Sequence, residues 1–174
     1  MKNNKKKKIG ILGGSFDPAH KGHIKISIEA KKKYKINKII WTITKKNPFK
    51  SKSYFELKKR IDFAKKITKQ HSFISVKYYE DKLKSNRTIN LINYIKSKNN
   101  CKIFLIIGAD NLVKFHKWHK WKLISQKCNI LVFDRHGYKK SSLKSKTFKQ
   151  LSKANLEFIE FNKVNISSSQ LRKI

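Results

Sequence analysis

The sequence predicts an α/β protein of one domain, built on a doubly wound, mostly parallel sheet with helices on both faces. Three observations support this fold class. Short apolar runs alternate with amphipathic stretches along the whole chain, as in repeated βαβ units. The 174 residues, of which 39% are hydrophobic, suffice for one core. A glycine turn also follows the first apolar run directly, at the point where Rossmann-like sheets bind ligands.

Six short apolar runs are the expected strands. Each is four to six residues long and bounded by charged or turn-forming residues, which favours strands over helices. In chain order they are Lys8–Leu12, Lys38–Ile43, Phe73–Val76, Lys102–Ile107, Asn129–Phe133 and Leu156–Phe161.

Helices are expected between these strands, where apolar residues recur at helical spacing. A polar segment, Lys139–Lys153, is expected to lie on the surface and to be partly helical. Residues 1–7 are expected to form a basic tail and residues 8–174 the folded domain. The expected helices are Gly22–Lys33, Tyr54–Thr68, Thr88–Lys98 and Trp118–Gln126.

The outlying bulk property is charge, because 44 lysines and arginines against 10 acidic residues give a formal net charge of +34. Such an excess attracts polyanions, and a nucleic-acid site is one interpretation. Nucleic-acid sites favour arginine, whose guanidinium donates two parallel hydrogen bonds. Here four of the 44 are arginines and the lysines are dispersed, which favours compositional drift. No specific nucleic-acid partner is therefore expected.

Export and membrane insertion are not expected either. The basic start is followed by four apolar-run residues before a glycine pair interrupts, which is too short for a signal peptide. No apolar run approaches the roughly 20 residues of a membrane span. Cys101 and Cys128 lack a CxxC partner and border apolar runs, which predicts buried thiols in a reducing compartment. We therefore expect a cytoplasmic protein without a membrane partner.

The main candidate site is the segment from Gly13 to His23. Gly13 and Gly14 allow the backbone to turn sharply and to approach a ligand closely. His20 and His23 are three residues apart at the start of an expected helix, so they add imidazole donors to an anion-binding helix N-terminus. The segment is neither GxGxxG nor a Walker A motif. A phosphate site is the favoured interpretation, and metal binding by Asp17 with both histidines is the alternative.

This segment, Gly-Ser-Phe-Asp-Pro-x-His-x-Gly-His, resembles the motif of the His-x-Gly-His nucleotidyltransferases. Further segments resemble those of bacterial nicotinate-nucleotide adenylyltransferases, in matching order from about Lys8 to Arg172. Residues 106–121 resemble the Gly-Ala-Asp and Trp segment of that family. The others are residues 47–50 followed by Arg60, residues 132–138, and the C-terminal residues 166–172.

The resemblance implies a reaction and its substrates. The phosphate of nicotinate mononucleotide attacks the α-phosphorus of MgATP, giving deamido-NAD and pyrophosphate in NAD biosynthesis. Mg²⁺ arrives with ATP and needs no dedicated protein metal site. The alternatives are adenylyl transfer to nicotinamide mononucleotide or phosphopantetheine. A different class of alternative is a polyanion-binding module that retains the fold without catalysis.

The resemblance also assigns the phosphate and adenosine contacts. His20 and His23 hold the triphosphate, Lys50 and Arg172 add cations, and Asp110 accepts from ribose hydroxyls. Ser167 and Ser168 can cap the last helix. The implied catalytic residues are His20, His23, Lys50 and Arg172. The implied ATP-binding residues are Gly13, Gly14, Ser15, Phe16, His20, His23, Gly108, Asp110, Ile166, Ser167, Ser168 and Arg172.

The implied nicotinate-nucleotide site consists of Lys50, Thr88 and Trp118, with Trp118 stacked on the pyridine ring. The chain departs from the family pattern at Arg87, where an aromatic residue usually precedes the threonine, so the pocket wall is expected to differ there. Ser169 also replaces a usual threonine.

Several neighbouring residues have more than one interpretation. Trp121 either packs in the core or contacts the ligand. Arg60 either forms a local salt bridge or contacts phosphate. His116 and His119 lie among lysines and are expected to be solvated.

Overall fold

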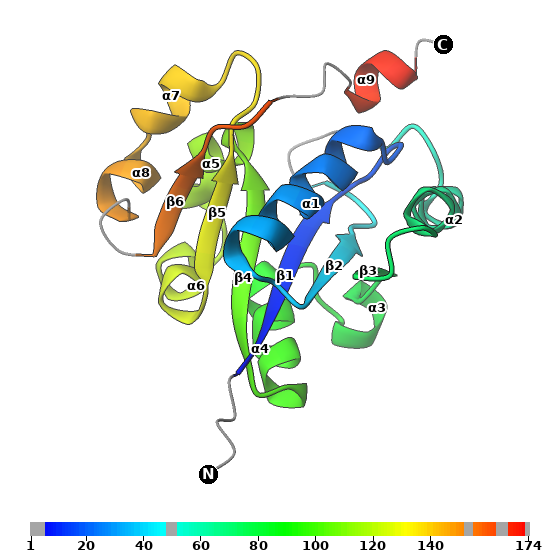
Figure 1. The fold of residues 1–174 in the computed structure, drawn as a ribbon, viewed down its shortest axis with the longest axis horizontal. Coiled ribbons are helices and arrows are strands. Elements are labelled where there is room, and N and C mark those ends of the chain that lie inside the picture. Colours follow the sequence, from blue (N-terminus) through cyan, green and yellow to red (C-terminus); the bar gives the residue numbers. More distant parts are fainter. Residues whose placement is uncertain (1–5, 48–51, 152–154, 163–166, 173–174) are drawn as a thin grey trace.

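The computed structural model describes residues 6–47, 52–151, 155–162 and 167–172. Within these residues, six strands form one sheet in the order β3-β2-β1-β4-β5-β6, and every neighbouring pair is parallel (Figure 1). The predicted fold class is therefore confirmed. The strands are β1 (Lys7–Gly14), β2 (Lys38–Ile43), β3 (Ile74–Lys77), β4 (Cys101–Gly108), β5 (Asn129–Phe133) and β6 (Leu156–Ile159).

Helices connect the strands and cover both faces of the sheet (Figure 1). Most are short, and the longer ones are amphipathic segments that bury one apolar face. In chain order the helices of the described residues are α1 (Lys21–Tyr34), α2 (Leu57–Thr68), α3 (Glu80–Leu83), α4 (Thr88–Lys98), α5 (Ala109–Lys114), the 3-10 helix η1 (Phe115–Lys117), α6 (Trp121–Lys127), α7 (Lys139–Leu143), α8 (Lys146–Leu151) and α9 (Ser168–Leu171).

The core is divided into two layers by the sheet, because successive strand side chains point to opposite faces. On β4, Leu105 packs in one layer with residues of α4, α5 and α6. Its neighbours Phe104 and Ile106 pack in the other layer with residues of α1 and α2. A strand buried on both faces has a continuous apolar sequence, which is why these runs are recognisable without their context.

The predicted strands and long helices are confirmed to within a few residues at each end. Three short helical elements that follow strands or turns were not predicted: α3, α5 and η1. The predicted helix from Trp118 is wrong at its start. Trp118 follows η1 in extended backbone, Lys120 has a left-handed φ of 53°, and α6 begins at Trp121.

The segment predicted as polar and partly helical contains α7 and α8. The prediction that it lies on the surface is wrong at Ser142 and Thr147, both of which are fully buried. The Ser142 hydroxyl donates to the carbonyl of Lys139, so its polar group is satisfied within its own helix.

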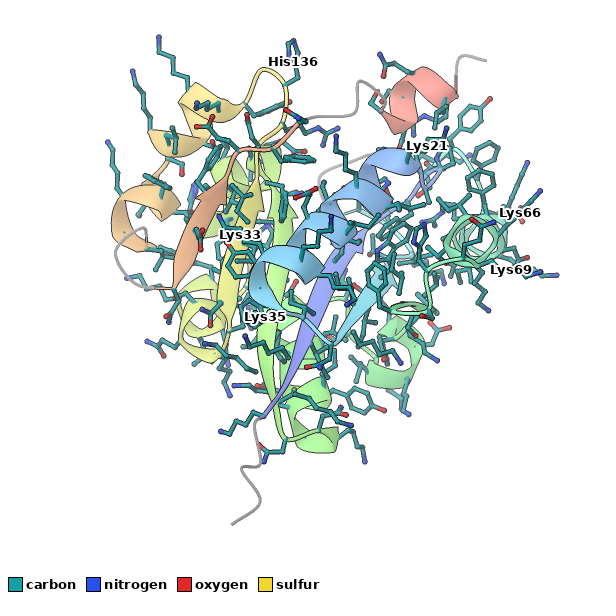
Figure 2. The ribbon with its side chains drawn as sticks, viewed as in Figure 1. Lys21, Lys33, Lys35, Lys66, Lys69 and His136 are labelled. Atoms are coloured by element: carbon teal, nitrogen blue, oxygen red, sulfur yellow. The ribbon has the colours of Figure 1, made fainter. Side chains whose placement is uncertain are left out.

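The excess lysines lie on the outside of several different helices. Figure 2 shows Lys33 and Lys35 at the end of α1, and Lys66 and Lys69 at the end of α2. Cations in the last turn of a helix stabilise its dipole, which gives part of the excess a local structural role. No helix among the described residues has the length and apolarity of a membrane span.

Candidate functional site

The candidate residues gather at the carboxyl edge of the sheet. Because all strands are parallel, the ends of β1, β2 and β4 open on the same edge, as they do in other open α/β sheets that bind ligands there. Figure 1 shows the start of α1 and the short helix α9 side by side at this end, although they are far apart in the sequence.

His20 and His23 form a reciprocal cap at the start of α1. His20 is the N-cap residue, and its Nδ1 accepts a hydrogen bond of 3.1 Å from the N–H of Gly22. The Nδ1 of His23 accepts one of 3.1 Å from the N–H of His20. With Nδ1 occupied as an acceptor, the neutral imidazole carries its proton on Nε2. Each ring therefore offers an Nε2–H donor beside a helix N-terminus, an arrangement that favours an anion.

Both histidines are neutral in the free protein near pH 7. Burial and, to a smaller extent, the positive charge of Arg135 lower the pKa of His20 to about 4. Burial, followed by the neighbouring His20 and Arg135, lowers the pKa of His23 well below its ordinary value. The two rings thus act as hydrogen-bond donors in the free protein and not as fixed cations.

The ring of His23 is held in place by aromatic packing. It lies 4.8 Å from the ring of Phe16 and 5.8 Å from that of Trp41, measured between centroids. Phe16 is 2% exposed and stacks on Trp41. Trp41 is in turn fixed by a 2.9 Å hydrogen bond from its Nε1 to the Ser27 hydroxyl. The Phe16 side chain therefore supports the histidine from behind.

Asp17 is buried and its carboxylate is fully engaged away from the histidines. Its oxygens accept from the N–H groups of Tyr54 at 2.6 Å and Phe55 at 2.9 Å, and Arg172 lies 3.3 Å from Oδ2. Among the described residues, no three His, Cys, Asp or Glu side chains gather to hold a metal ion. The alternative ligand set of Asp17 with both histidines is thus not assembled, because the carboxylate already has three donors.

The C-terminal motif reaches this loop. Ser167 caps α9, and the Ser168 hydroxyl donates to the carbonyl of Pro18 at 2.8 Å. Arg172 donates to the carbonyl of Asp17 at 3.1 Å. The structure therefore brings residues 167–172 together with the loop before His20. Two other predicted site residues, Lys50 and Ile166, lie outside the described residues.

A second group of residues follows β4 and β5. The Asp110 carboxylate forms an ion pair with Arg135, with 2.5 Å between Oδ2 and Nη1. Its other oxygen, Oδ1, is buried and has no hydrogen-bond partner among the described atoms. A Cβ added to Gly108 would lie 2.5 Å from that same oxygen. Because Gly108 has no side chain, it leaves room for Oδ1 of Asp110, which can accept a hydrogen bond from a ligand hydroxyl.

Arg135 was given no role from the sequence. It lies two residues after the end of β5, so the rule that functional residues come just after strands would have found it. Its charge acts on both histidines and it pairs with Asp110, so it links the two parts of the phosphate end.

A cavity of about 430 Å³ lies between the ends of β1, β2 and β4 and the helices α3, α4 and α6. Thr88 and Trp118 line it, and Gly13 and Gly14 line it at the end of β1. Apolar side chains of β1, β4, α4 and α6 form its wall: Ile11, Leu91, Leu105, Ile107 and Ile124.

The structure therefore divides the predicted residues between two adjoining parts. The residues Gly108 and Asp110, both histidines and Arg172 do not line the cavity, whereas Thr88 and Trp118 do. Gly13 and Gly14 connect the two parts, because they line the cavity and lead into the His20 loop.

The surroundings of Trp121 and Arg60 favour a structural role for both residues. Trp121 does not line the cavity and packs edge-on against Phe115, so it belongs to the core. Arg60 is 2% exposed, and it forms no ion pair within the part of the chain that the structure describes. Its guanidinium instead donates to the backbone carbonyls of Ser15, Thr44, Lys45 and Phe55 at 2.7 to 3.0 Å.

Glu80 was not predicted as a cavity residue, and the prediction that His116 is solvated is wrong. Glu80 lines the cavity and accepts from the Thr44 hydroxyl and from the N–H of Lys45. The sequence carried no signal for it. His119 is exposed, as predicted, and it also lines the cavity, with its Nε2 3.3 Å from Nη1 of Arg87. His116 is half-buried and its Nδ1 is enclosed.

The chain is similar in sequence to proteins of a known family. The sequence profile of the family described as "Cytidylyltransferase-like" matches residues 11–174. The chain is 62% identical to the "Probable nicotinate-nucleotide adenylyltransferase" of Pelagibacter ubique over 172 residues, which are 99% of this chain and 96% of that protein. A protein of the same name from Agrobacterium fabrum is 34% identical over 151 residues, covering 86% of this chain and 80% of that one.

A solved structure has the same fold. It is the nicotinic acid mononucleotide adenylyltransferase of Plasmodium falciparum, complexed with NaAD. The TM-score is 0.75 at 24% sequence identity, with 96% of this chain and 83% of that chain covered. At this identity the match supports the arrangement of strands and helices.

Proposed function

The chain belongs to the nicotinate-nucleotide adenylyltransferases of the cytidylyltransferase-like family, and from this premise we propose how its own residues carry out the reaction. The enzyme transfers the adenylyl group of ATP to nicotinate mononucleotide, forming deamido-NAD (nicotinate adenine dinucleotide) and pyrophosphate in NAD biosynthesis.

One observation supports this function above the others. A pair of neutral Nε2–H donors at the start of α1 adjoins an apolar cavity that contains Trp118, and the two are joined at Gly13 and Gly14. A donor pair at a helix N-terminus suits a polyphosphate. A cavity with an indole ring and aliphatic walls suits a flat heteroaromatic ring. Deamido-NAD, the dinucleotide product, contains both linked phosphates and a pyridine ring.

The chemistry demands positioning and stabilisation of negative charge. A phosphate oxygen of the mononucleotide attacks the α-phosphorus of MgATP, and the bond to the β-phosphate oxygen breaks, so that pyrophosphate leaves with the electron pair. Such in-line transfer requires little covalent participation by the protein. His20 and His23 donate to the triphosphate oxygens as charge develops on them. Lys50 and Arg172 supply positive charge, and Mg²⁺ enters as part of the MgATP substrate.

The adenosine of ATP lies against Gly108 and Asp110, where the free Oδ1 of Asp110 accepts from a ribose hydroxyl. The backbone around Gly13, Gly14 and Ser15 approaches the phosphates, while Phe16 acts from behind His23. Ser167 and Ser168 close this side through the contact between the Ser168 hydroxyl and the carbonyl of Pro18. The pyridine ring stacks on Trp118, with Thr88 at the start of α4 near the ring substituent.

We also propose a cytoplasmic location. Cys101 and Cys128 are both buried and unpaired, which suits a reducing compartment where ATP is abundant.

The test is pyrophosphate release from MgATP with nicotinate mononucleotide, nicotinamide mononucleotide and 4′-phosphopantetheine as alternative acceptors. Release is expected with the first. His20→Ala should reduce kcat by on the order of 10²-fold, as does the loss of one preorganised donor elsewhere. The control Lys32→Ala changes an exposed residue of the same helix. If wild-type protein released no pyrophosphate with nicotinate mononucleotide, the proposed function would be wrong.

A further inference from the structure

Arg87 places a guanidinium at the mouth of the cavity. It directly precedes α4 and lines the cavity together with Thr88 and Trp118. The family pattern that this segment resembles has an aromatic ring at this position. A guanidinium there is therefore a chemical change in the wall that faces the pyridine ring, and it calls for an explanation.

The arginine is oriented by His119. Its Nη1 lies 3.3 Å from Nε2 of His119, whose ring also lines the cavity. Burial, then the charges of Arg87 and Lys120, lower the pKa of His119. A neutral imidazole can accept at Nε2, so the contact holds the guanidinium in one direction and uses one of its five N–H donors. Among the described residues, no carboxylate forms an ion pair with Arg87.

The carboxylate that lines the cavity does not pair with the Arg87 guanidinium. Among the described residues that line the cavity, Glu80 is the one carboxylate. Its oxygens accept from the Thr44 hydroxyl and the N–H of Lys45 on the opposite wall. Burial lowers the pKa of Arg60, and the negative charges of Asp17 and Glu80 oppose that effect, so Glu80 also stabilises the Arg60 guanidinium. The remaining donors of Arg87 are thus available to an anionic ligand.

The position of Arg87 determines which anion it meets. The phosphate donors His20 and His23 do not line the cavity, and they join it through Gly13 and Gly14 at the end of β1. A mononucleotide with its phosphate at that end directs its ring toward Trp118. Arg87 belongs to the ring end of the cavity, and the anionic group on a nicotinate ring is its carboxylate.

We infer that Arg87 is a specificity-determining residue that selects nicotinate over nicotinamide mononucleotide by donating to the ring carboxylate, an inference that rests on the proposed function. A carboxylate accepts from two guanidinium N–H groups at once. A carboxamide is neutral and would turn its own N–H donors toward those of the arginine unless it presented only its oxygen. The site therefore discriminates by charge and by donor pattern, and both substrates keep the same phosphate contacts.

The test compares both mononucleotides with wild type, Arg87→Gln, Arg87→Lys and Lys117→Gln. Lys117→Gln is the matched control, because Lys117 also lines the cavity and its loss removes the same charge. Arg87→Gln should lower the kcat/KM ratio of nicotinate to nicotinamide mononucleotide by about tenfold, the lower range for a hydrogen bond to a charged group. The change should appear in KM for the nicotinate substrate, with kcat and the KM for ATP retained. Arg87→Lys should keep part of the preference.

Three results would overturn the inference. Equal losses with both mononucleotides would show that Arg87 acts on the shared phosphate or on folding. An unchanged kcat/KM ratio would show that Arg87 takes no part in recognising the ring carboxylate. A similar fall of this ratio in Lys117→Gln would show that the preference comes from the overall positive potential of the cavity. If wild type turned over neither mononucleotide, the proposed function itself would fail. Direct titration of both mononucleotides against tryptophan fluorescence would then still decide whether Arg87 discriminates in binding.

Discussion

The Arg172 guanidinium is bound to Asp17, its Nη1 lying 3.1 Å from the backbone carbonyl and 3.3 Å from Oδ2 of that residue. The two are 155 positions apart in the sequence. Asp17 also accepts from two backbone N–H groups in front of α2. One buried carboxylate therefore ties the C-terminal motif and the approach to α2 to the loop that precedes His20.

Asp17→Ala should destabilise the protein by about 2–4 kcal/mol, because it leaves two backbone N–H donors without their acceptor and removes the carboxylate that pairs with Arg172. Asp17 is 3% exposed, so water does not replace the carboxylate readily. Urea unfolding followed by circular dichroism measures the change. Asp62→Ala removes an exposed acid from α2 and serves as the control. Equal stability of the two variants would contradict the role of Asp17.

Arg60→Met should cost about 3 kcal/mol of unfolding free energy, because four partly buried carbonyls lose a buried guanidinium donor. These carbonyls belong to the segments that follow β1 and β2 and to the start of α2, so the site should loosen as well. Thermal unfolding and the KM values for both substrates are the measurements. Lys58→Met, an exposed cation two residues earlier, is the control. A melting temperature equal to that of the control would exclude a structural role for Arg60.

The fold could be predicted because its signal is local. A strand such as β4 is buried on both faces, so its apolar run is visible without knowledge of its neighbours. The helix after Phe115 could not be located, because three short elements follow one another and Lys120 adopts a left-handed backbone. A sequence window as long as a typical helix spans several of these short elements, so its periodicity does not show where each one begins.

The site could be predicted only where a motif carries the chemistry in consecutive residues. His20 and His23 are such a case, since their spacing and the glycines before them indicate anion binding on their own. The functions of Arg60, Arg87 and Arg135 depend on partners brought close by the fold: carbonyls from two loops, His119, and Asp110. The position of Arg135 just after β5 is a local signal, but no local pattern distinguishes Arg60 or Arg87 from a surface cation.

His20 should titrate near pH 4 in the free protein, well below the ordinary value of 6.5. Since the unfolded chain binds this proton at higher pH than the folded chain, the histidine contributes stability that is present above pH 6.5 and is lost as pH falls toward 4. NMR of the imidazole carbons measures the titration. Arg135→Gln should raise the pKa of His20, because it removes the cation that opposes protonation. A midpoint near 6.5 in wild type would contradict the buried neutral donor.

Gly108→Ala should weaken ATP binding with little effect on the pyridine nucleotide. The new Cβ would lie 2.5 Å from Oδ1 of Asp110 and would displace the carboxylate from its position beside Arg135. The backbone at Gly108 has a φ of −81°, which alanine adopts without strain. We expect the KM for ATP to rise by about tenfold, in line with the loss of one hydrogen bond to a charged group. The KM for nicotinate mononucleotide is the internal control, and an equal rise in both would refute the division of the site.

Replacement of Trp118 should weaken ligand binding, whereas replacement of Trp121 should lower the stability of the fold. Trp118 lines the cavity and its Nε1 has no hydrogen-bond partner among the described atoms, whereas Trp121 packs edge-on against Phe115 in the core. Trp118→Ala should weaken nicotinate mononucleotide binding by about 1–3 kcal/mol, the range for stacking of a base on an aromatic side chain.

Trp121→Ala should instead lower the unfolding free energy by about 3 kcal/mol or more, as large-to-small changes in a core do. The KM for nicotinate mononucleotide should stay within about twofold of wild type wherever the variant is folded. Kinetics and urea unfolding on both variants form one experiment. The assignment of Trp118 to the pyridine ring would be wrong if its replacement altered stability alone. A selective rise in KM with Trp121→Ala would instead place the second indole in the binding site, with the core contact to Phe115 as its support.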